Sequence, residues 1–323
     1  MTGDIVSCVI GGEQYALGGG HIREILRVER MRCGSRPGGA AGVVTIGGET
    51  VPVYSLASIL DQQSGPADAS RPAGSQIIVT HGSRGAVGWL VDGVARSRLP
   101  ADARVTPLPP LVGPPATRWF EGLLEIEERS LLVLSPEHLD PRAPSPPPDR
   151  DHRVSASPPT LTTRPPRGGA ARLVVMFSSP ALPRCGAHRY GLSARRIAAV
   201  IPSLPICVVP GSAPRVTGVA AWRGGVMPVM DFRDACDRPA IERERLLVVR
   251  SGGALVAFPV EAEMALHQAT RDDREADDER DSNPPFVAGT FIVAGSRLAL
   301  LDLDALLAPV RVAPGSTTDA HTH

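Results

Sequence analysis

The sequence predicts an all-β protein in which one domain is built twice. The most direct observation is a repeated cassette, because residues 42–56 and 218–232 align with each other without a gap. Apolar runs of four to six residues, bounded by Gly, Pro, Asp or Ser, recur along both halves and are typical of barrel or sandwich strands. Helical periodicity is nearly absent.

Each cassette predicts a β-hairpin. In the first, two short apolar runs flank Gly47-Gly48, and glycine readily adopts the positive φ that a tight hairpin turn demands. We expect Gly224-Gly225 to form the matching turn in the second cassette. Pro52 and Pro228 have no N–H for a strand ladder, so each is expected on an edge or at the first residue of a strand.

Residues that are able to cap a helix follow the hairpins and return near the end of each half. Their side-chain oxygens can accept hydrogen bonds from the N–H groups of a first helical turn. Proline after Ser135 supports a helix there, because proline is favoured at the first helical position. Matched strands end in Asp92 and Glu261, which are expected to cap turns or to add solubility at a strand end. The predicted caps and helical turns are Ser55 before 56–60, Asp231 before 232–236, Ser135 in 135–139 and Asp302 in 302–307.

The two halves match beyond the cassette. Tyr15-Ala-Leu17 corresponds to Tyr190-Gly-Leu192 at an offset of 175 residues (190 − 15), and the hairpins correspond at 176 (218 − 42). A later apolar run, 77–79, corresponds to 246–248 at an offset of 169 (246 − 77). The offset drifts only slightly, so we expect two copies of one scaffold with small differences in loop length.

A proline-rich segment separates the halves. Nine prolines lie between 141 and 169 among few large apolar residues, and such a composition favours an extended, semi-rigid linker over a packed domain. The predicted parts are a first domain over 1–141, a linker over 142–169, a second domain over 170–310 and a disordered tail over 311–323.

The composition argues against several classes of protein. Basic and acidic residues number 34 each, so no net charge attracts the chain to nucleic acid or an anionic membrane. No apolar stretch approaches the roughly 20 residues of a membrane span, and no signal peptide is expected. Five cysteines with no Cys-x-x-Cys pair predict neither a disulfide framework nor a zinc site, which fits a reduced, cytoplasmic setting. They are Cys8, Cys33, Cys185, Cys207 and Cys236.

Taken in order, the motifs of both halves resemble the CheW-like domain. These motifs are a Tyr-Ala-Leu strand leading to Glu24-Ile25, a Gly-Val hairpin closing on Val-Pro-Val, a Leu-Val-Asp strand and a terminal leucine-rich run. The resemblance implies two CheW-like domains, each a pair of small five-stranded SH3-like β-barrels with short helices. It also implies a non-catalytic scaffold of bacterial chemosensory signalling that has no cofactor.

The same resemblance implies the partners. CheW-like adaptors couple the cytoplasmic tips of methyl-accepting chemoreceptors to a CheA-type histidine kinase, and contacts with other CheW-like proteins fit the same surfaces. We therefore expect a cytoplasmic chain that is recruited to membrane-associated receptor arrays without inserting into the membrane. Two modules on one chain gain avidity when the linker lets both engage.

The resemblance assigns binding roles unequally to the two halves. The family arginine before the hairpin glycine is matched by Arg223, where the first half has Gly47. The family glutamate is matched by Glu24, where the second half has Ala199. A buried charge without its partner is strongly unfavourable, so we expect both groups to be solvated or paired elsewhere, a partner protein included. The predicted protein-binding residues are Arg223, Gly218, Gly224, Glu24, Gly42 and Val43, with hairpin bracing as the alternative role of Arg223.

Metal and catalytic sites find little support in the sequence. The acidic run 272–281 lacks the ligand spacing and central glycine of an EF-hand loop, and His321 and His323 lie in the predicted tail, so no metal site is expected. Two alternatives stay open. One copy has degenerated into a spacer or array-modifying module, or the barrels form a pocket that binds a small ligand.

Overall fold

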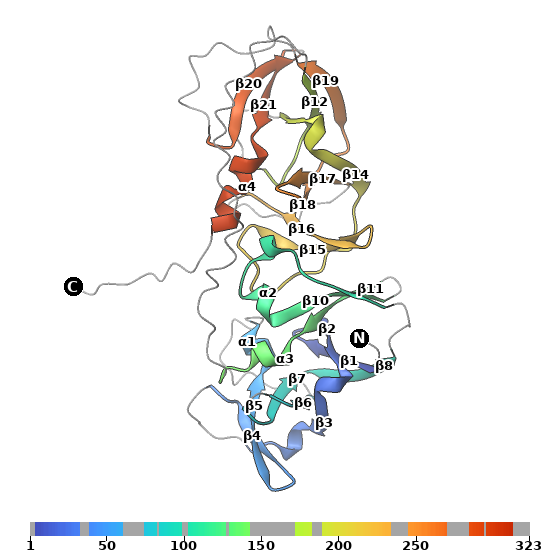
Figure 1. Ribbon diagram of the computed structural model, residues 1–323, viewed down its shortest axis with the longest axis vertical. Helices are drawn as coiled ribbons and strands as arrows, with labels where there is room; N and C mark the ends of the chain where they lie inside the picture. The colour runs from blue at the N-terminus through green and yellow to red at the C-terminus, as the bar shows by residue number, and fades with distance from the viewer. Residues whose placement is uncertain are drawn as a thin grey trace, which may run out of the picture. The chain divides into compact units, whose positions relative to one another are not determined.

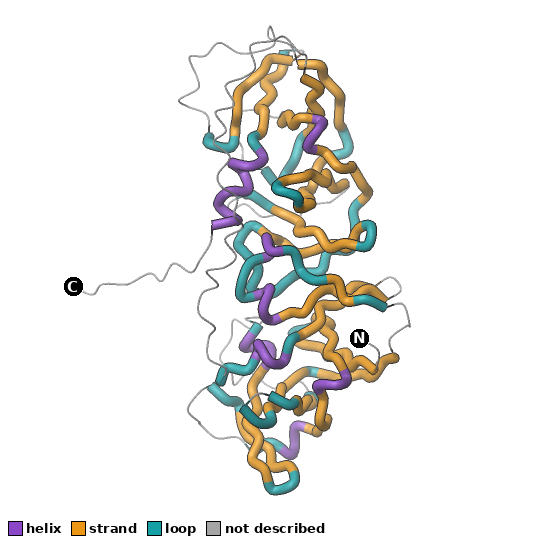
Figure 2. The backbone as a smooth tube through the Cα atoms, in the orientation of Figure 1, coloured by secondary structure: helices purple, strands orange, loops and turns teal. Residues whose placement is uncertain are grey.

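Strands prevail in both halves of the chain and the helices are short (Figures 1 and 2). A computed structural model describes residues 4–32, 39–60, 74–82, 84–98, 103–126, 129–142, 172–182, 189–233, 245–269, 284–293 and 295–312. Within these residues, no helix combines the length and the apolar character that crossing a membrane requires. The predicted all-β fold class is confirmed.

The first half forms two sheets. Their strand orders are β8-β1-β2-β11-β10-β9 and β3-β6-β7-β5-β4. Neighbouring strands are mostly antiparallel, but β2 lies parallel to β11 and β5 lies parallel to β7. The strands are β1 (Asp4–Ile10), β2 (Glu13–Gly18), β3 (Ile22–Arg27), β4 (Gly42–Ile46), β5 (Glu49–Ser55), β6 (Gln76–Thr80), β7 (Val87–Val91), β8 (Gly93–Arg98), β9 (Val105–Thr106), β10 (Phe120–Ile126) and β11 (Arg129–Leu134).

The second half repeats this topology. Its sheets have the orders β19-β12-β13-β21-β20 and β14-β17-β18-β16-β15, with the parallel pairs again at matching places, β13 with β21 and β16 with β18. Among the described strands, β9 of the first half has no counterpart. The strands are β12 (Arg172–Phe177), β13 (Arg189–Ser193), β14 (Ile197–Pro202), β15 (Val216–Trp222), β16 (Gly225–Met230), β17 (Arg245–Ser251), β18 (Ala254–Val260), β19 (Met264–Ala269), β20 (Val287–Val293) and β21 (Ser296–Leu301).

The irregularities of the sheets repeat as well. The pairing of β3 with β6 shifts between Ile22 and Glu24, and that of β14 with β17 shifts between Ile197 and Ala199, at the offset of 175 (197 − 22). A bulge adds an unpaired residue and bends the strand. Because both copies have it at the same place, they share the register and the bend of this strand as well as the strand order. Ala199 therefore occupies the position of Glu24, as the sequence predicted.

The expectation for the two hairpin prolines is wrong. Pro52 and Pro228 lie inside β5 and β16, and each of these strands has a neighbour on both sides. In the pairing of each strand with its parallel neighbour, Val53 lies opposite Gly88 and Val229 lies opposite Ala257, each one residue after the proline. Proline therefore lies at the start of the parallel pairing, where its lack of an N–H does not end the strand.

The predicted caps are largely present. Ser58 N donates to Ser55 Oγ at 3.3 Å at the start of α1, and Asp302 Oδ1 accepts from Asp304 N and Ala305 N at 3.0 and 3.1 Å. Ser135 differs, because its side chain makes no cap bond and lies 2.9 Å from His138 Nδ1 instead. The helices are α1 (Leu56–Ile59), α2 (Ala116–Trp119), α3 (Pro136–Leu139) and α4 (Leu303–Val312), with short 3-10 turns at Gly19–His21, Val28–Arg30, Pro110–Val112 and Ala194–Arg196.

Two compact units make up the chain, and they do not coincide with the sequence halves. Unit 1 comprises 1–145 together with 205–213 and 218–226, and unit 2 comprises the remainder. In unit 1, Val209 and Val219 are buried in the same hydrophobic core as Trp89.

Backbone hydrogen bonds reinforce this arrangement inside unit 1. Ala213 N donates to Val112 O at 2.8 Å, and Ala116 N donates to Gly211 O at 3.3 Å. The segment 205–213 is therefore an integral part of unit 1.

The core of unit 2 contains an aromatic cluster. The ring centroid of Phe177 lies 6.2 Å from that of Tyr190 and 5.9 Å from that of Phe258. All three side chains are buried, and such pairs add to the stabilisation that burial of their apolar surface provides.

Several sequence predictions fall outside the described residues. These are most of the linker, the acidic run 272–281, three of the cysteines, the predicted turn after Arg233, and His321 and His323. The helix α4 ends at Val312, two residues inside the range predicted as the tail.

Candidate protein-binding site

The tip of the second hairpin places Arg223 in an unusual backbone conformation. The turn between β15 and β16 consists of Arg223 with φ +52° and Gly224 with φ +73°, not of Gly224 and Gly225 as the sequence suggested. Of the described residues other than glycine, Arg223 alone has a positive φ. A side chain in this region costs roughly 1–2 kcal/mol, a strain that is found most often at functional positions.

The Arg223 side chain is exposed but has a defined neighbour. Its guanidinium carbon lies 4.6 Å from the centroid of the Trp222 ring, within the range of a cation–π interaction. Trp222 itself is only half-buried. A flat cation on an aromatic face is thus presented at the tip, a combination that is enriched in the energetic centres of protein interfaces.

The first hairpin has the same turn without the side chain. Gly47 has φ +53° and Gly48 has φ +84°, at the positions of Arg223 and Gly224 (223 − 47 and 224 − 48 are both 176). Glu24 lies half-buried on β3, and within the described part of the chain its carboxylate forms no hydrogen bond or ion pair. Each copy therefore retains one of the two expected charges, as the sequence indicated.

The first copy has a different ion pair between strand and hairpin, which the sequence analysis missed. Arg23 Nη1 on β3 lies 2.6 Å from Glu49 Oε2 at the start of β5. The hydrogen bond from Arg23 lowers the pKa of the Glu49 carboxyl below its ordinary value. The second half has Ala198 and Gly225 at these positions (198 − 23 is 175; 225 − 49 is 176), so this pair belongs to the first copy alone.

Three of the predicted binding residues lie against the chain's own backbone. Val43 exchanges hydrogen bonds with Arg32, at 2.8 and 3.0 Å, and Gly42 beside it is buried. A Cβ on Gly42 would lie 2.8 Å from Arg32 O, and one on Gly218 would lie 2.5 Å from Cys207 O. Glycine at 42 and 218 thus allows a neighbouring segment to approach closely, and the exposed members of the predicted set are Arg223 and Gly224.

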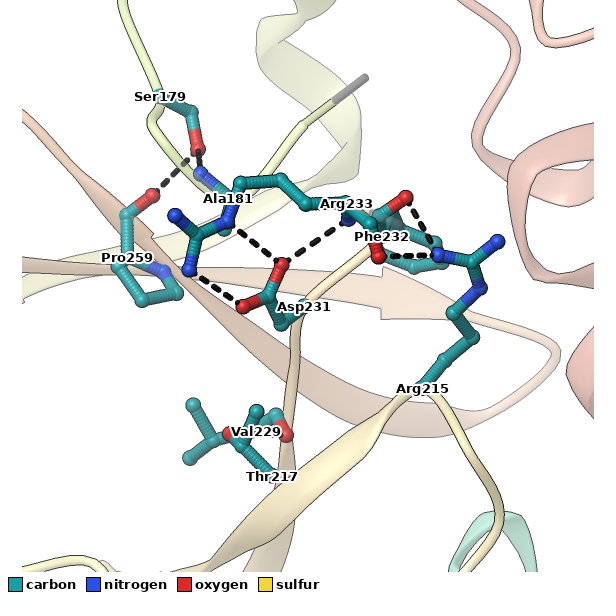
Figure 3. A network of polar contacts seen from close by, with 9 residues as sticks. All are labelled: Ser179, Ala181, Arg215, Thr217, Val229, Asp231, Phe232, Arg233 and Pro259. Atoms are coloured by element: carbon teal, nitrogen blue, oxygen red, sulfur yellow. Dashed lines mark hydrogen bonds and ion pairs between the residues drawn. The ribbon is translucent and has the colours of Figure 1, made fainter. Parts of the chain in front are cut away.

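A polar network lies where the second hairpin begins and ends (Figure 3). The Asp231 carboxylate is buried and accepts three hydrogen bonds from Arg233, from the backbone N at 3.0 Å, Nε at 3.1 Å and Nη2 at 2.7 Å. Arg215 Nη1 donates to the carbonyl oxygens of Phe232 and Arg233 at 2.7 and 2.6 Å. Two arginines and one carboxylate therefore fix the chain immediately after β16.

The first half has no such network at the matching positions. Asp231, Arg233 and Arg215 correspond to Ser55, Ala57 and Gly39, each at the offset of 176 (231 − 55, 233 − 57, 215 − 39). Ser55 acts there as a helix cap. At both the tip and the base of the hairpin, the second copy thus has charged side chains where the first copy has small uncharged residues.

The thiols of the two described cysteines are disfavoured as thiolates near neutral pH. Burial and the nearby Asp92 charge raise the pKa of the Cys8 thiol to about 12, and burial raises that of Cys207 to about 11. No three His, Cys, Asp or Glu side chains of the described ranges gather as a metal site. Asp92 has the predicted turn-capping role, because its Oδ2 accepts from Gly11 N at 2.8 Å.

The sequence model of one family matches both halves. The CheW-like domain matches residues 4–142 and 182–310, which together span most of the chain. The protein belongs to the CheW-like domain family. It is a tandem CheW-like protein, with one matched segment in each half.

Solved structures also resemble the chain, among them a scaffolding protein. The tandem CheW-like protein is similar to the scaffolding protein TtCheW from Thermoanaerobacter tengcongensis, with 20% sequence identity over 43% of this chain and 88% of TtCheW, and a TM-score of 0.37. No curated protein matches the chain.

Proposed function

We propose that this tandem CheW-like protein is a non-catalytic chemosensory adaptor that couples chemoreceptor cytoplasmic tips to a CheA-type histidine kinase. Membership of the CheW-like domain family supports a coupling role in chemotaxis. Exposed protein surfaces, not reactive groups, perform this work. Recruitment of the chain to receptor arrays follows from the same role.

The conformation of Arg223 carries the proposal. A hairpin turn with two positive φ values is best made by two glycines, as at Gly47-Gly48 of the first copy. The second copy has an exposed arginine at the first of these positions, stacked on Trp222, in spite of the backbone strain. Neither packing nor turn geometry requires that side chain, and binding of a partner accounts for it.

A titration of the full chain tests this proposal. The regulatory domain of a CheA-type kinase and a receptor-tip fragment are titrated separately against the wild type, Arg223→Ala and Glu24→Ala. Loss of a central interface arginine typically weakens binding by about tenfold or more, so we expect this for Arg223→Ala and a smaller effect for Glu24→Ala. Arg250→Ala, on the exposed end of β17, is the control. Unchanged affinity of Arg223→Ala for both partners would contradict the assignment.

A second candidate function is favoured by the differences between the copies. Gly47, Ser55 and Ala57 replace the charged side chains that the second copy retains, so the first copy is the better candidate for a spacer or array-modifying module. If the second copy alone binds the kinase, Arg223→Ala weakens binding of the full chain by the full tenfold or more. If both bind, substantial affinity stays with the first copy.

A further inference from the structure

We propose that Asp231, Arg233 and Arg215 are positioning residues for Arg223, which they hold in its binding orientation through the two strands of the hairpin. This inference rests on the proposed function, since it concerns how the same hairpin is presented to a partner. The three residues flank the two strands at the base of the hairpin, and Arg223 lies in the turn between these strands. They need no direct contact with the partner.

The network is placed at both ends of the hairpin. β15 begins at Val216, directly after Arg215, and β16 ends at Met230, directly before Asp231. Asp231 N donates to Arg215 O at 2.8 Å, and this backbone hydrogen bond joins the two chain segments at the base of the hairpin. The Arg215 side chain donates in turn to Phe232 O and Arg233 O. Thr217 Oγ1 adds a bond to Val229 O at 3.0 Å between the two strands.

The base of the hairpin is also attached to the segment that follows β12. Phe232 N donates to Ala181 O at 2.7 Å, Ala181 N donates to Ser179 Oγ at 3.2 Å, and Ser179 Oγ donates to Pro259 O at 2.5 Å (Figure 3). Through these bonds the base is attached to segments from both sheets of the second half. A hairpin that is fixed at its base loses less conformational freedom when its tip binds, and pre-organisation of this kind raises affinity.

The internal repeat provides an independent comparison. The first copy has lost the tip arginine, with Gly47, and has lost all three network residues, with Gly39, Ser55 and Ala57. If the network served only to stabilise a hairpin of this family, the first hairpin would need it equally. The first half has an Asp-x-Arg pair of its own, in which Arg142 donates to Asp140 at 2.9 Å, but this pair follows α3 and not the hairpin. Directly after the hairpin, such a pair is present only in the copy that retains the arginine, and this placement supports a link between the network and the presentation of Arg223.

A double-mutant cycle with kinase binding as the readout tests the inference. Asp231→Ser with Arg233→Ala introduces the residues of the first copy and removes both charges together, so no buried charge is left unpaired. This pair of substitutions is combined with wild-type Arg223 or with Arg223→Ala in the full chain. We expect Arg223→Ala to weaken binding about tenfold, the pair about five- to tenfold, and all three together no more than about twofold beyond Arg223→Ala alone.

Hydrogen exchange tests whether the pair fixes the hairpin locally, while the coupling measured in the cycle is the readout that a purely stabilising role would not produce. In the paired variant, exchange is expected to accelerate in 216–230 and to stay unchanged in β17 and β18, with circular dichroism confirming the fold. Effects that multiply in the cycle, or a paired variant that binds like the wild type, would overturn the positioning role while leaving the proposed function intact. An Arg223→Ala variant with unchanged affinity would overturn both.

Discussion

Arg23 donates a hydrogen bond to Glu49 at 2.6 Å, and this pair joins β3 to the first hairpin. It has the opposite polarity to the pair that the family resemblance suggests, since the cation lies on the strand and the carboxylate on the hairpin. Arg23 is also the residue at which the register of β3 shifts. The bulge thus offers a reason why Arg23, rather than its neighbour Glu24, contacts the hairpin.

The first prediction concerns the pH dependence of this pair. Because Arg23 lowers the pKa of Glu49 in the folded chain, the pair stabilises the fold above the pKa that Glu49 has when unfolded, and this contribution is lost as pH falls through the folded pKa. Glu49→Gln should therefore lower the melting temperature slightly at pH 7 and leave it unchanged at strongly acid pH. Glu29→Gln, on an exposed turn, is the control. Identical carboxyl titrations of Glu49 by NMR in the wild type and in Arg23→Ala would refute the assignment.

Close backbone approach at Gly218 leads to the second prediction. A Cβ there would lie 2.5 Å from Cys207 O and 2.7 Å from Ile206 Cγ2, so Gly218→Ala should destabilise the chain by about 2 kcal/mol through steric overlap. Gly225→Ala is the matched control, since its nearest neighbour is 3.7 Å away, and it should change stability by less than about 0.5 kcal/mol. Urea denaturation of the two variants measures the difference, and equal midpoints would contradict it.

Repetition made the sheets predictable, because each strand was seen twice with the same turn residues around it. The bulges at Ile22–Glu24 and Ile197–Ala199 were not predictable, since no short-range signal marks an inserted residue. The Arg23–Glu49 pair depends on such a bulge and was missed for that reason. The Asp231–Arg233 pair spans only two residues, and an Asp-x-Arg motif directly after a strand was a signal that could have revealed it.

The packing of segment 205–213 into unit 1 could not be predicted from the sequence either. The segment 205–213 reads as a loop of the second half, with two prolines and no clear period. Its inclusion in unit 1 depends on contacts with residues about a hundred positions earlier, Val112 and Ala116 among them. Patterns within a short window carry no information about such contacts.

The third prediction tests that inclusion. Val209 is buried in the core of unit 1, whereas its neighbour Val208 is 59% exposed. Val209→Ala should lower the free energy of unfolding by about 2 kcal/mol, and Val208→Ala, the control, should change it by less than about 0.5 kcal/mol. In Val209→Ala, hydrogen exchange should accelerate in α2 and β11 of unit 1. Acceleration confined to β14, β17 and β18 would contradict the assignment of 205–213 to unit 1.

The fourth prediction separates stability from binding at the hairpin tip. Arg223→Gly relieves the backbone strain but loses the stacking on Trp222 and gives the unfolded chain more freedom, so these effects should nearly cancel. We expect the unfolding free energy to change by less than about 0.5 kcal/mol, while kinase binding weakens about tenfold. Thermal unfolding and titration of the same preparation provide both numbers. A loss of stability in parallel with the loss of binding would favour hairpin bracing as the role of Arg223.

The fifth prediction concerns the buried pair of Asp231 and Arg233. Their side chains are 3% and 13% exposed, so Asp231→Ala leaves a nearly buried guanidinium without its carboxylate and should cost about 3 kcal/mol of stability or more. Asp231→Ser combined with Arg233→Ala removes both charges and should cost less than the single substitution, because no unpaired charge remains. Denaturant unfolding monitored by the near-ultraviolet signal measures both. A double variant that is less stable than Asp231→Ala would contradict this expectation. It would mean that the hydrogen bonds of the pair stabilise the fold by more than desolvation of the two charges costs, and that an unpaired guanidinium is not the main cost of Asp231→Ala.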